Sequence, residues 1–443
     1  MTSAKKDDTV SLQSFDREQY PPPGSEREDV WCKSSEGAGE GTLERGEEMP
    51  RRSPAVIGQE CPPLGEIQVE PRIFLFALSR KARGVFCWKE AEQMDLLSLE
   101  KEVGGRLERL DFDSLWPGFR QYEFALYDDE RAVLNGELFP RPQDFWANTA
   151  LPWQGRRIAV WGMREDLDLD VLASKLAHEM FHAYQMEQGE GRFANELQTA
   201  GRFHPTPELL QLCHEENRLL VSLAGQFGPG AWERLLSLRR TRQERFPYEY
   251  DYQCRVEAIE GSAQYVELAA LHCLAPEKYT KALELLIDKA DWLEPLFSLR
   301  PMCYDTGALL LLILVQNGLP LDRTVGPDAP FFAQALVEAA PPLPSPPEPC
   351  PALLAAVRDH EKTLRRRAAR ICAHGVRRRG SFRLLGFNCY DPQRLGDYVF
   401  SGGYLAYENE NGEQVVLTED AMFRMEGDRL TEVIGAERSQ SRI

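Results

Sequence analysis

The chain has 443 residues, 43% of them hydrophobic, and a formal net charge of −18. This length and apolar content allow a sizeable core and two or three domains, and the negative charge argues against general affinity for nucleic acid or an anionic membrane. No apolar signal segment follows Met1, and the 10 cysteines lack paired spacing, which is typical of thiols in a reducing compartment. We therefore expect a cytoplasmic protein that binds neither nucleic acid nor membrane.

The N-terminal part of the chain divides into a tail and a small sheet. Residues 1–65 are rich in Ser, Glu, Gly and Pro, a composition that predicts a disordered acidic tail. Patterns typical of β-strands follow at 67–70, 72–78 and 122–127, with a helix predicted at 89–103. The sequence therefore predicts a small β-sheet with a helix.

A short apolar strand and a long helix come next. Residues 156–162 read as a strand closed by glycine. Asp166, Asp168 or Asp170 can cap the following helix and place negative charge at its first turn. Small and unbranched residues then favour helix as far as Gly189.

This predicted helix carries His178, Glu179 and His182, in the pattern HExxH. Residues four apart share a helix face, so both imidazoles can reach one Zn²⁺ at about 2.0–2.1 Å. A neighbouring carboxylate that does not bind the metal can act as general base on the metal-activated water. The alternative is a surface helix with two unrelated histidines.

A third metal ligand is required, and the sequence narrows its location. Gln185 and Gln188 occupy the positions where metzincins have glycine and a third histidine, which excludes that class. A better candidate is Glu260, in the segment I-E-G-S-A-Q-Y-V-E at 259–267. Glu257 and Glu196 remain as alternatives.

The two segments together resemble the gluzincin zinc metallopeptidases, related in pattern to aminopeptidase N-like and thermolysin-like enzymes. The resemblance covers two helices and implies that His178, His182 and Glu260 bind zinc while Glu179 is the general base. Ile259 stands where the aminopeptidases have asparagine. The gap between the segments is also longer than in those enzymes, and amphipathic helices predicted at 207–223 and 230–242 fill it.

Two further residues have candidate roles near this site. Glu267 lies two turns beyond Glu260 on the same predicted face, where it can hydrogen-bond a ligand histidine or an arginine. Tyr304 resembles the tyrosine that precedes a helix in related gluzincins, which implies that it donates to the oxyanion. The alternative is a buried tyrosine at a helix start; Tyr265 and Tyr184 are weaker candidates for the donor. The apolar run at 308–315 is far shorter than the roughly 20 residues that cross a bilayer, so it predicts a core helix.

The C-terminal part of the chain begins with a Pro-rich segment. Residues 341–350 predict a stiff linker, and 351–379 predict a basic helix. The arginines of this helix can be interpreted in two ways. They could bind nucleic acid or an acidic partner, or they could dock on the protein's own acidic surface, and we favour the second interpretation. At 380–443 we expect a small all-β domain, because short strand patterns flank an Asn-Gly turn at 411–412.

The sequence thus predicts an α+β fold: a zincin-like metallopeptidase domain at 66–340, with a small β-sheet in its N-terminal lobe and a mostly helical second lobe. By the resemblance, an edge strand of the sheet, for which 145–150 is the candidate, holds extended substrate. The expected function is zinc-dependent hydrolysis of peptide bonds in a peptide or protein. The alternative is an inactive binding or regulatory protein on the same scaffold, which Glu179 argues against, because a structural metal needs no base.

Overall fold

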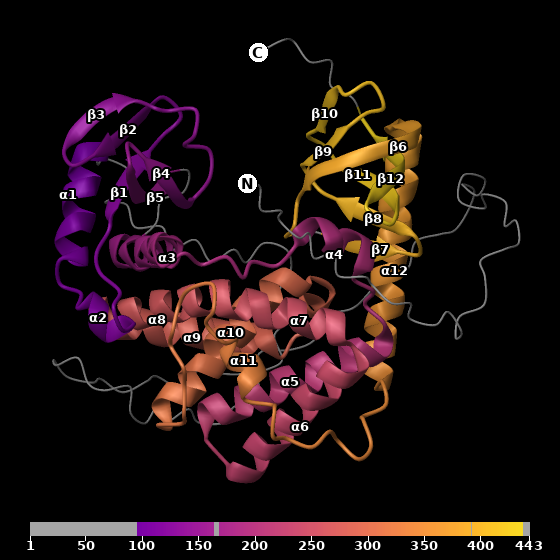
Figure 1. Cartoon of the computed structure of the whole chain (residues 1–443), viewed down its shortest axis with the longest axis horizontal. Coiled ribbons are helices and arrows are strands. Elements are labelled where there is room, and N and C mark those ends of the chain that lie inside the picture. Colours follow the sequence, from indigo (N-terminus) through magenta and orange to yellow (C-terminus); the bar gives the residue numbers. More distant parts are fainter. Residues whose placement is uncertain (1–94, 164–167, 391, 437–443) are drawn as a thin grey trace, which may run out of the picture. The chain divides into compact units, whose positions relative to one another are not determined.

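A computed structural model describes residues 95–163, 168–390 and 392–436, all within one compact unit, Ser53–Ile443. The predicted tail at 1–65 and the strands predicted at 67–70 and 72–78 lie outside the described residues, as does Asp166. The described chain has a mixed α/β fold, in which helices accompany one mixed sheet and a separate antiparallel sheet (Figure 1).

The first sheet has five strands in the order β3-β2-β1-β5-β4. β1 and β5 are parallel and the other neighbours are antiparallel. The strands predicted at 122–127 and 156–162 are confirmed as β1 and β5. The edge strand is β4, later than the predicted 145–150, because Phe145 is fully buried in the preceding loop. The strands are β1 Glu123–Tyr127, β2 Arg131–Leu134, β3 Glu137–Pro140, β4 Thr149–Trp153 and β5 Arg156–Gly162.

Two helices pack against this sheet. α1 (Leu96–Leu107) begins after Asp95, whose side chain accepts a hydrogen bond from the Ser98 backbone N–H and caps the helix. It matches the second half of the helix predicted at 89–103, and residues 89–94 lie outside the described residues. α3 (Leu169–Glu187) follows β5 and contacts both β5 and β4. Of the three aspartates proposed as caps of this helix, Asp168 accepts the backbone N–H bonds.

The remaining helices of this part of the chain form a largely helical body beside α3. The helices predicted at 207–223 and 230–242 are confirmed as α5 and α6. Several helices begin with proline, which has a helical φ and no N–H to leave unpaired. The elements are α2 Phe112–Leu115, α4 Glu196–Arg202, α5 Pro207–Gly225, α6 Pro229–Arg245, α7 Pro247–Val256, η3 Glu257–Gly261, α8 Ser262–Leu274, α9 Pro276–Ala290, η4 Glu294–Phe297, α10 Leu299–Gln316 and α11 Phe332–Ala335.

α7, η3 and α8 run on without a break, and η3 is a π-helical turn. α8 packs along α3, and η3 packs against α10. At that second contact Gly261 lies so close to Gly307 that a Cβ on Gly261 would be 2.7 Å from the Gly307 Cα. The absence of both side chains therefore brings η3 and α10 together.

α10 contains the apolar run predicted as a core helix. By length and composition it could cross a membrane, but 67% of this stretch is buried inside the protein, and it packs against α5, α8 and η3. α10 begins at Leu299, so Tyr304 lies inside the helix rather than before it. The helix starts earlier than the sequence indicates because Leu299, Met302 and Cys303 are already buried in a hydrophobic cluster.

The C-terminal part consists of α12 (Pro351–His374) and a seven-stranded antiparallel sheet in the order β10-β9-β6-β12-β11-β8-β7. The hairpin predicted around the Asn-Gly turn is confirmed as β9 and β10, with Gly412 at φ 81°. The strands are β6 Val376–Phe387, β7 Gln393–Leu395, β8 Tyr398–Ser401, β9 Leu405–Glu408, β10 Gln414–Leu417, β11 Ala421–Glu426 and β12 Arg429–Gly435.

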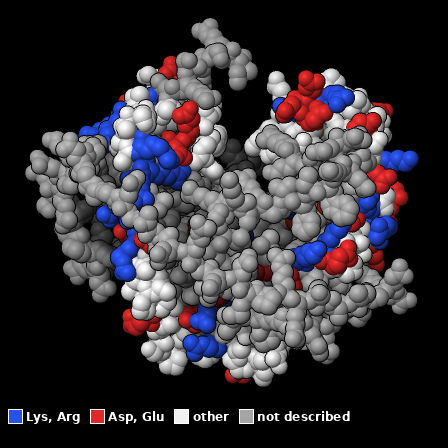
Figure 2. All heavy atoms as spheres, turned by 180° about the vertical axis from the view of Figure 1, so that it is seen from behind, with Lys and Arg blue, Asp and Glu red and all other residues white. Residues whose placement is uncertain are grey.

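The predicted basic helix at 351–379 is too long. α12 ends at His374, because Gly375 has an extended backbone, and 377–379 lie on β6. Three arginines of this stretch pair with acidic residues of the C-terminal part: Arg367 and Arg370 with Asp420, just before β11, and Arg377 with Glu432 on β12. These pairs support docking on the protein's own surface. On the face in Figure 2, basic and acidic side chains of the described residues also lie next to one another.

Candidate metal centre

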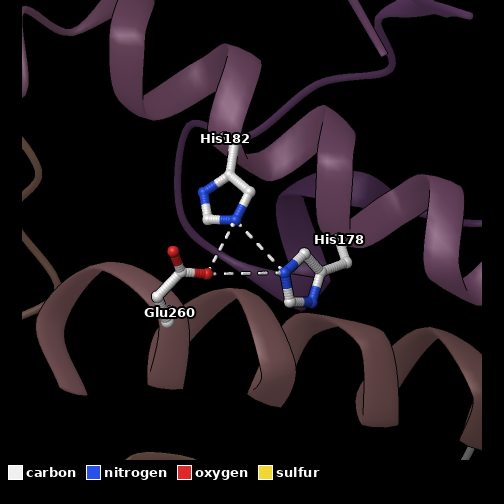
Figure 3. A group of neighbouring side chains, drawn as sticks. All are labelled: His178, His182 and Glu260. Carbon is white, nitrogen blue, oxygen red and sulfur yellow. Dashed lines mark hydrogen bonds and ion pairs between the residues drawn. The ribbon is translucent and has the colours of Figure 1, made fainter. Parts of the chain in front are cut away.

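Three side chains from two elements converge beside α3 (Figure 3). His178 and His182 come from α3 and Glu260 from η3, and one ligand atom of each lies within 4.8 Å of the others. The two Nε2 atoms are 3.1 Å apart, and Glu260 Oε2 lies 3.2 Å from that of His182 and 3.8 Å from that of His178. Ligand atoms of a tetrahedral zinc ion are about 3.3 Å apart, given bonds of roughly 2.0–2.1 Å. The donor set and its spacing therefore fit one zinc ion.

Each histidine has a partner at its other ring nitrogen. Gln185 Oε1 lies 2.7 Å from His182 Nδ1, and Glu267 Oε2 lies 3.2 Å from His178 Nδ1. Partners at Nδ1 favour the tautomer that leaves Nε2 free for a metal and restrict rotation of the ring. Glu267 thus contacts His178 as an ion pair, although His178 Nδ1 makes no hydrogen bond of ordinary geometry, and Lys175 Nζ lies 3.0 Å from the same carboxylate.

Gln185 also joins the two elements of the centre. Its amide Nε2 donates to the Ile259 carbonyl at 3.0 Å and to Ser262 Oγ at 3.1 Å. These acceptors flank Glu260 in the chain, so one side chain ties His182 to the turn that carries Glu260. Sequence reasoning used Gln185 only to exclude the metzincins, since nothing in the local pattern indicates a contact with a segment so far along the chain.

Arg300 on α10 holds the other oxygen of Glu260. Its Nη2 donates to Glu260 Oε1 at 2.6 Å, which leaves Oε2 directed at the histidines. Arg300 Nη1 also donates to Glu196, and Glu196 accepts from the Tyr252 hydroxyl at 2.8 Å. The alternative ligand Glu196 therefore takes part in a neighbouring network rather than in the group with the histidines. Sequence analysis missed Arg300, for which the local pattern gives no signal.

Glu257, the second alternative ligand, is engaged elsewhere. Its side chain is fully buried and its carboxylate accepts from Arg239 Nη2 at 2.5 Å and from Thr306 Oγ1 at 2.7 Å. Arg239 also pairs with Glu216 at 2.8 Å. This buried cluster lies one turn before Glu260 and does not include either histidine.

The charges around the centre favour a positive species between the three ligands. Burial alone would lower the pKa of His178, but Glu260 and Glu267 raise it to about 10. The pKa of His182 is also raised, because Glu260 outweighs the effect of burial. Burial opposes ionisation of Glu260, yet the histidines and Arg300 hold the pKa of this carboxyl well below its usual range. In the metal-free protein, these carboxylates favour a proton on the histidines, at the place where a zinc ion would bring positive charge.

Glu179, the predicted general base, is buried with 9% of its surface exposed. Burial raises the pKa of this carboxyl, although His178 and His182 oppose the shift. A carboxyl with a raised pKa exchanges a proton more readily near neutral pH than an ordinary glutamate does. The environment of Glu179 therefore suits proton transfer.

Tyr304 lies beside the histidines, whereas the two weaker candidates do not. Its ring is 6.5 Å from the His178 ring, centroid to centroid, and nearly parallel to it. Burial raises the pKa of Tyr304 strongly, so the phenol keeps its proton. Tyr184 donates instead to the Pro117 carbonyl at 3.2 Å, and Tyr265 packs edge-on against Trp116.

A cavity of about 200 Å³ opens beside Glu260. It lies between the turn η3, the segment that leads into α4 and the Arg300 side chain, and its volume suits a single amino-acid side chain. Its wall combines charged and apolar groups: Phe193, Ala194, Glu196, Arg255, Val256, Ile259, Glu260 and Arg300.

Comparison of the chain with models of known protein families, with characterised proteins and with solved structures gives no match.

Proposed function

We propose that this protein is a zinc-dependent metallopeptidase of the gluzincin type, with His178, His182 and Glu260 as the zinc ligands. The observation that carries the proposal is the convergence of both Nε2 atoms and one carboxylate oxygen on a point that fits a single ion. The small sheet before α3 and the helices after it are in keeping with a zincin-like arrangement of two lobes.

Each residue has a role in peptide hydrolysis. When bound, zinc polarises the scissile carbonyl and lowers the pKa of an attacking water to about 7. Glu179 takes one proton from that water as its oxygen bonds to the carbonyl carbon, and then gives the proton to the amine nitrogen as the C–N bond breaks. Tyr304 donates a hydrogen bond to the carbonyl oxygen as negative charge develops on it.

The substrate is a peptide in extended conformation. β4 lies at an edge of the five-stranded sheet and contacts α3, so its outer side can add a peptide strand through backbone hydrogen bonds. The cavity beside Glu260 then receives one side chain of that peptide. We place this activity in the cytoplasm, in keeping with the scattered cysteines, of which Cys213, Cys254 and Cys303 are buried thiols.

The proposal is tested by metal content and hydrolysis in the same preparations. Inductively coupled plasma mass spectrometry should find about one zinc per chain, and a peptide library should contain cleaved members. Glu179→Gln should keep the zinc and lose hydrolysis, whereas His178→Ala and Glu260→Ala should lose both. His204→Ala, at an exposed histidine outside the site, is the matched control and should lose neither.

Three results would count against all or part of the proposal. If zinc is absent even after it is added back, the site does not bind this metal. If zinc is bound but no library peptide is cleaved, the protein is better explained as a binding protein on the same scaffold. Zinc retained by Glu260→Ala would show that the third ligand is a different residue.

A further inference from the structure

The C-terminal sheet region reaches the candidate metal centre through one aromatic side chain. Tyr390 follows β6, and its hydroxyl oxygen lies 3.1 Å from that of Tyr304. The Arg300 guanidinium lies 5.7 Å from the Tyr304 ring centroid and 5.6 Å from that of Tyr390, within the range of cation–π attraction. Tyr390 remains 55% exposed, so it stands at the rim of the site.

The segment that presents Tyr390 is held by hydrogen bonds within the C-terminal part. The Asn388 backbone N–H donates to the Tyr404 carbonyl at 3.1 Å and to Ser401 Oγ at 3.0 Å. The Asn388 side chain donates to the Gly402 carbonyl at 2.8 Å and accepts from the Tyr390 N–H at 3.1 Å. The backbone at Tyr390 is therefore fixed by the sheet region, and its contact with Tyr304 does not depend on a free loop.

α4 makes a second connection between the C-terminal sheet and the site. Ala200 is part of the hydrophobic core of that sheet, and its carbonyl accepts from Arg394 Nη2 at 2.6 Å. The same helix begins with Glu196, which pairs with Arg300, the partner of Glu260. Two independent sets of contacts thus connect the C-terminal sheet with the residues around the metal ligands.

The hydroxyl pair has a chemical consequence. Each phenol carries one proton, so only one can donate across the 3.1 Å contact. If Tyr390 donates, the Tyr304 proton is left to point at a substrate oxygen, and the accepted bond makes the Tyr304 O–H a stronger donor.

We infer that Tyr390 is a positioning residue of the peptidase site: by donating to the Tyr304 hydroxyl, it directs the Tyr304 proton to the oxyanion. The C-terminal β domain is then part of the active site. This inference rests on the proposed function, and Tyr390 acts through Tyr304 rather than on the substrate.

The test is a double-mutant cycle on the full-length, zinc-loaded protein, with Tyr390→Phe, Tyr304→Phe and the double variant. Tyr390→Phe should lower kcat by about tenfold, the worth of one hydrogen bond, with KM, zinc content and thermal midpoint unchanged. The double variant should be no slower than Tyr304→Phe, since Tyr390 has no effect without the Tyr304 hydroxyl. Tyr404→Phe is the control, at another half-exposed tyrosine of the same sheet region, and should keep the wild-type kcat.

An unchanged kcat in Tyr390→Phe, or a double variant slowed by the product of the two single effects, would overturn the inference. A second measurement does not depend on activity: NMR of protein labelled with ¹³C at tyrosine Cζ. The Tyr304 resonance, assigned from Tyr304→Phe, should shift in Tyr390→Phe and not in Tyr404→Phe. If wild-type protein binds zinc but cleaves no peptide, the proposed function fails, and this resonance alone decides whether Tyr390 orients Tyr304.

Discussion

Gln185 Oε1 lies 2.7 Å from His182 Nδ1, three residues back on the same helix. The amide of Gln185 also donates to the carbonyl of Ile259. This one side chain therefore sets both the orientation of the His182 imidazole and its distance from the turn that carries Glu260. Residues that orient metal ligands in this way typically change metal affinity by about 10–100-fold when they are removed.

Gln185→Ala should therefore weaken zinc binding by about 10–100-fold while the fold is kept. Competition with a chromophoric chelator measures the dissociation constant. Gln188→Ala is the matched control, because Gln188 is exposed just after α3, and its affinity should equal that of the wild type. Equal affinities in the two variants would show that Gln185 does not support the metal ligand.

Zinc binding should release protons. With its pKa raised to about 10, His178 is protonated at pH 7 in the metal-free protein, and zinc binds only the neutral imidazole. The apparent affinity should therefore rise with pH between about 6 and 8. Calorimetry in buffers of different ionisation enthalpy counts the protons, and we expect between about one and two per zinc; heats that do not depend on the buffer would contradict this.

The raised pKa of His178 gives the stability of the metal-free protein a pH dependence opposite to that of zinc affinity: stability falls as the pH rises. A raised pKa means that the folded state binds the proton more tightly than the unfolded state, whose histidine pKa is near 6.5. The stabilisation by His178 is therefore complete below pH 6.5 and is lost as the pH rises towards 10. Urea titrations across this range should show it in metal-free wild type, and the dependence should diminish in His178→Ala.

Gly307→Ala should destabilise the protein, because the new Cβ would lie 2.8 Å from the Gly261 Cα and 3.0 Å from the Glu257 Cα. Backbone atoms cannot move aside as a flexible side chain can, so we expect a loss of about 1–3 kcal/mol in the free energy of unfolding. Gly105→Ala in α1 is the control. Its Cβ has no atom within 4 Å, so the change should stabilise by about 0.5–1 kcal/mol. Urea denaturation measures both, and similar values would contradict the close packing of η3 on α10.

The buried cluster of Arg239, Glu257 and Glu216 should be sensitive to loss of one charge. Glu257→Gln leaves Arg239 buried without one of its two carboxylate partners, and broken buried pairs cost about 3–5 kcal/mol. Glu361→Gln is the control, since the pair of Glu361 with Arg365 is half-exposed and such pairs contribute about 0–1 kcal/mol. Chemical denaturation of both variants should differ by several kcal/mol, and equal values would mean that the cluster is readily solvated.

Local rules accounted for much of the fold. The Asp168 cap, the α3 helix and the β9–β10 turn each depend on residues close together in the chain, so the sequence indicates them directly. The end of α12 was misjudged because the run of arginines continues across Gly375, and charge pattern alone does not distinguish a helix from a strand. The predicted edge strand was misplaced because Phe145 is buried by contacts with β-strand residues on either side of it in the chain.

In the candidate site too, the sequence indicates some residues and only the structure reveals the others. The spacing of His178 and His182 fixes their relation on one helix turn, and Glu260 was proposed from a resemblance between segments. Arg300, Gln185 and Tyr390 came only from the structure. Each contacts a residue brought close by packing of separate elements, and no periodicity or motif records such a contact.

Because η3 is a π-helical turn, the geometry of the site depends on the number of residues in this segment. A π turn contains one residue more than an α turn, and successive residues of an α-helix are about 100° apart around its axis. If one residue of η3 were deleted, the segment could close as ordinary α-helix, and the part of the chain after the deletion would rotate by about that angle relative to α7. Glu257 could not then stay in its buried cluster while Glu260 and Glu267 face α3. A single substitution in this turn leaves the angle between its two ends unchanged, whereas a change in its number of residues alters that angle.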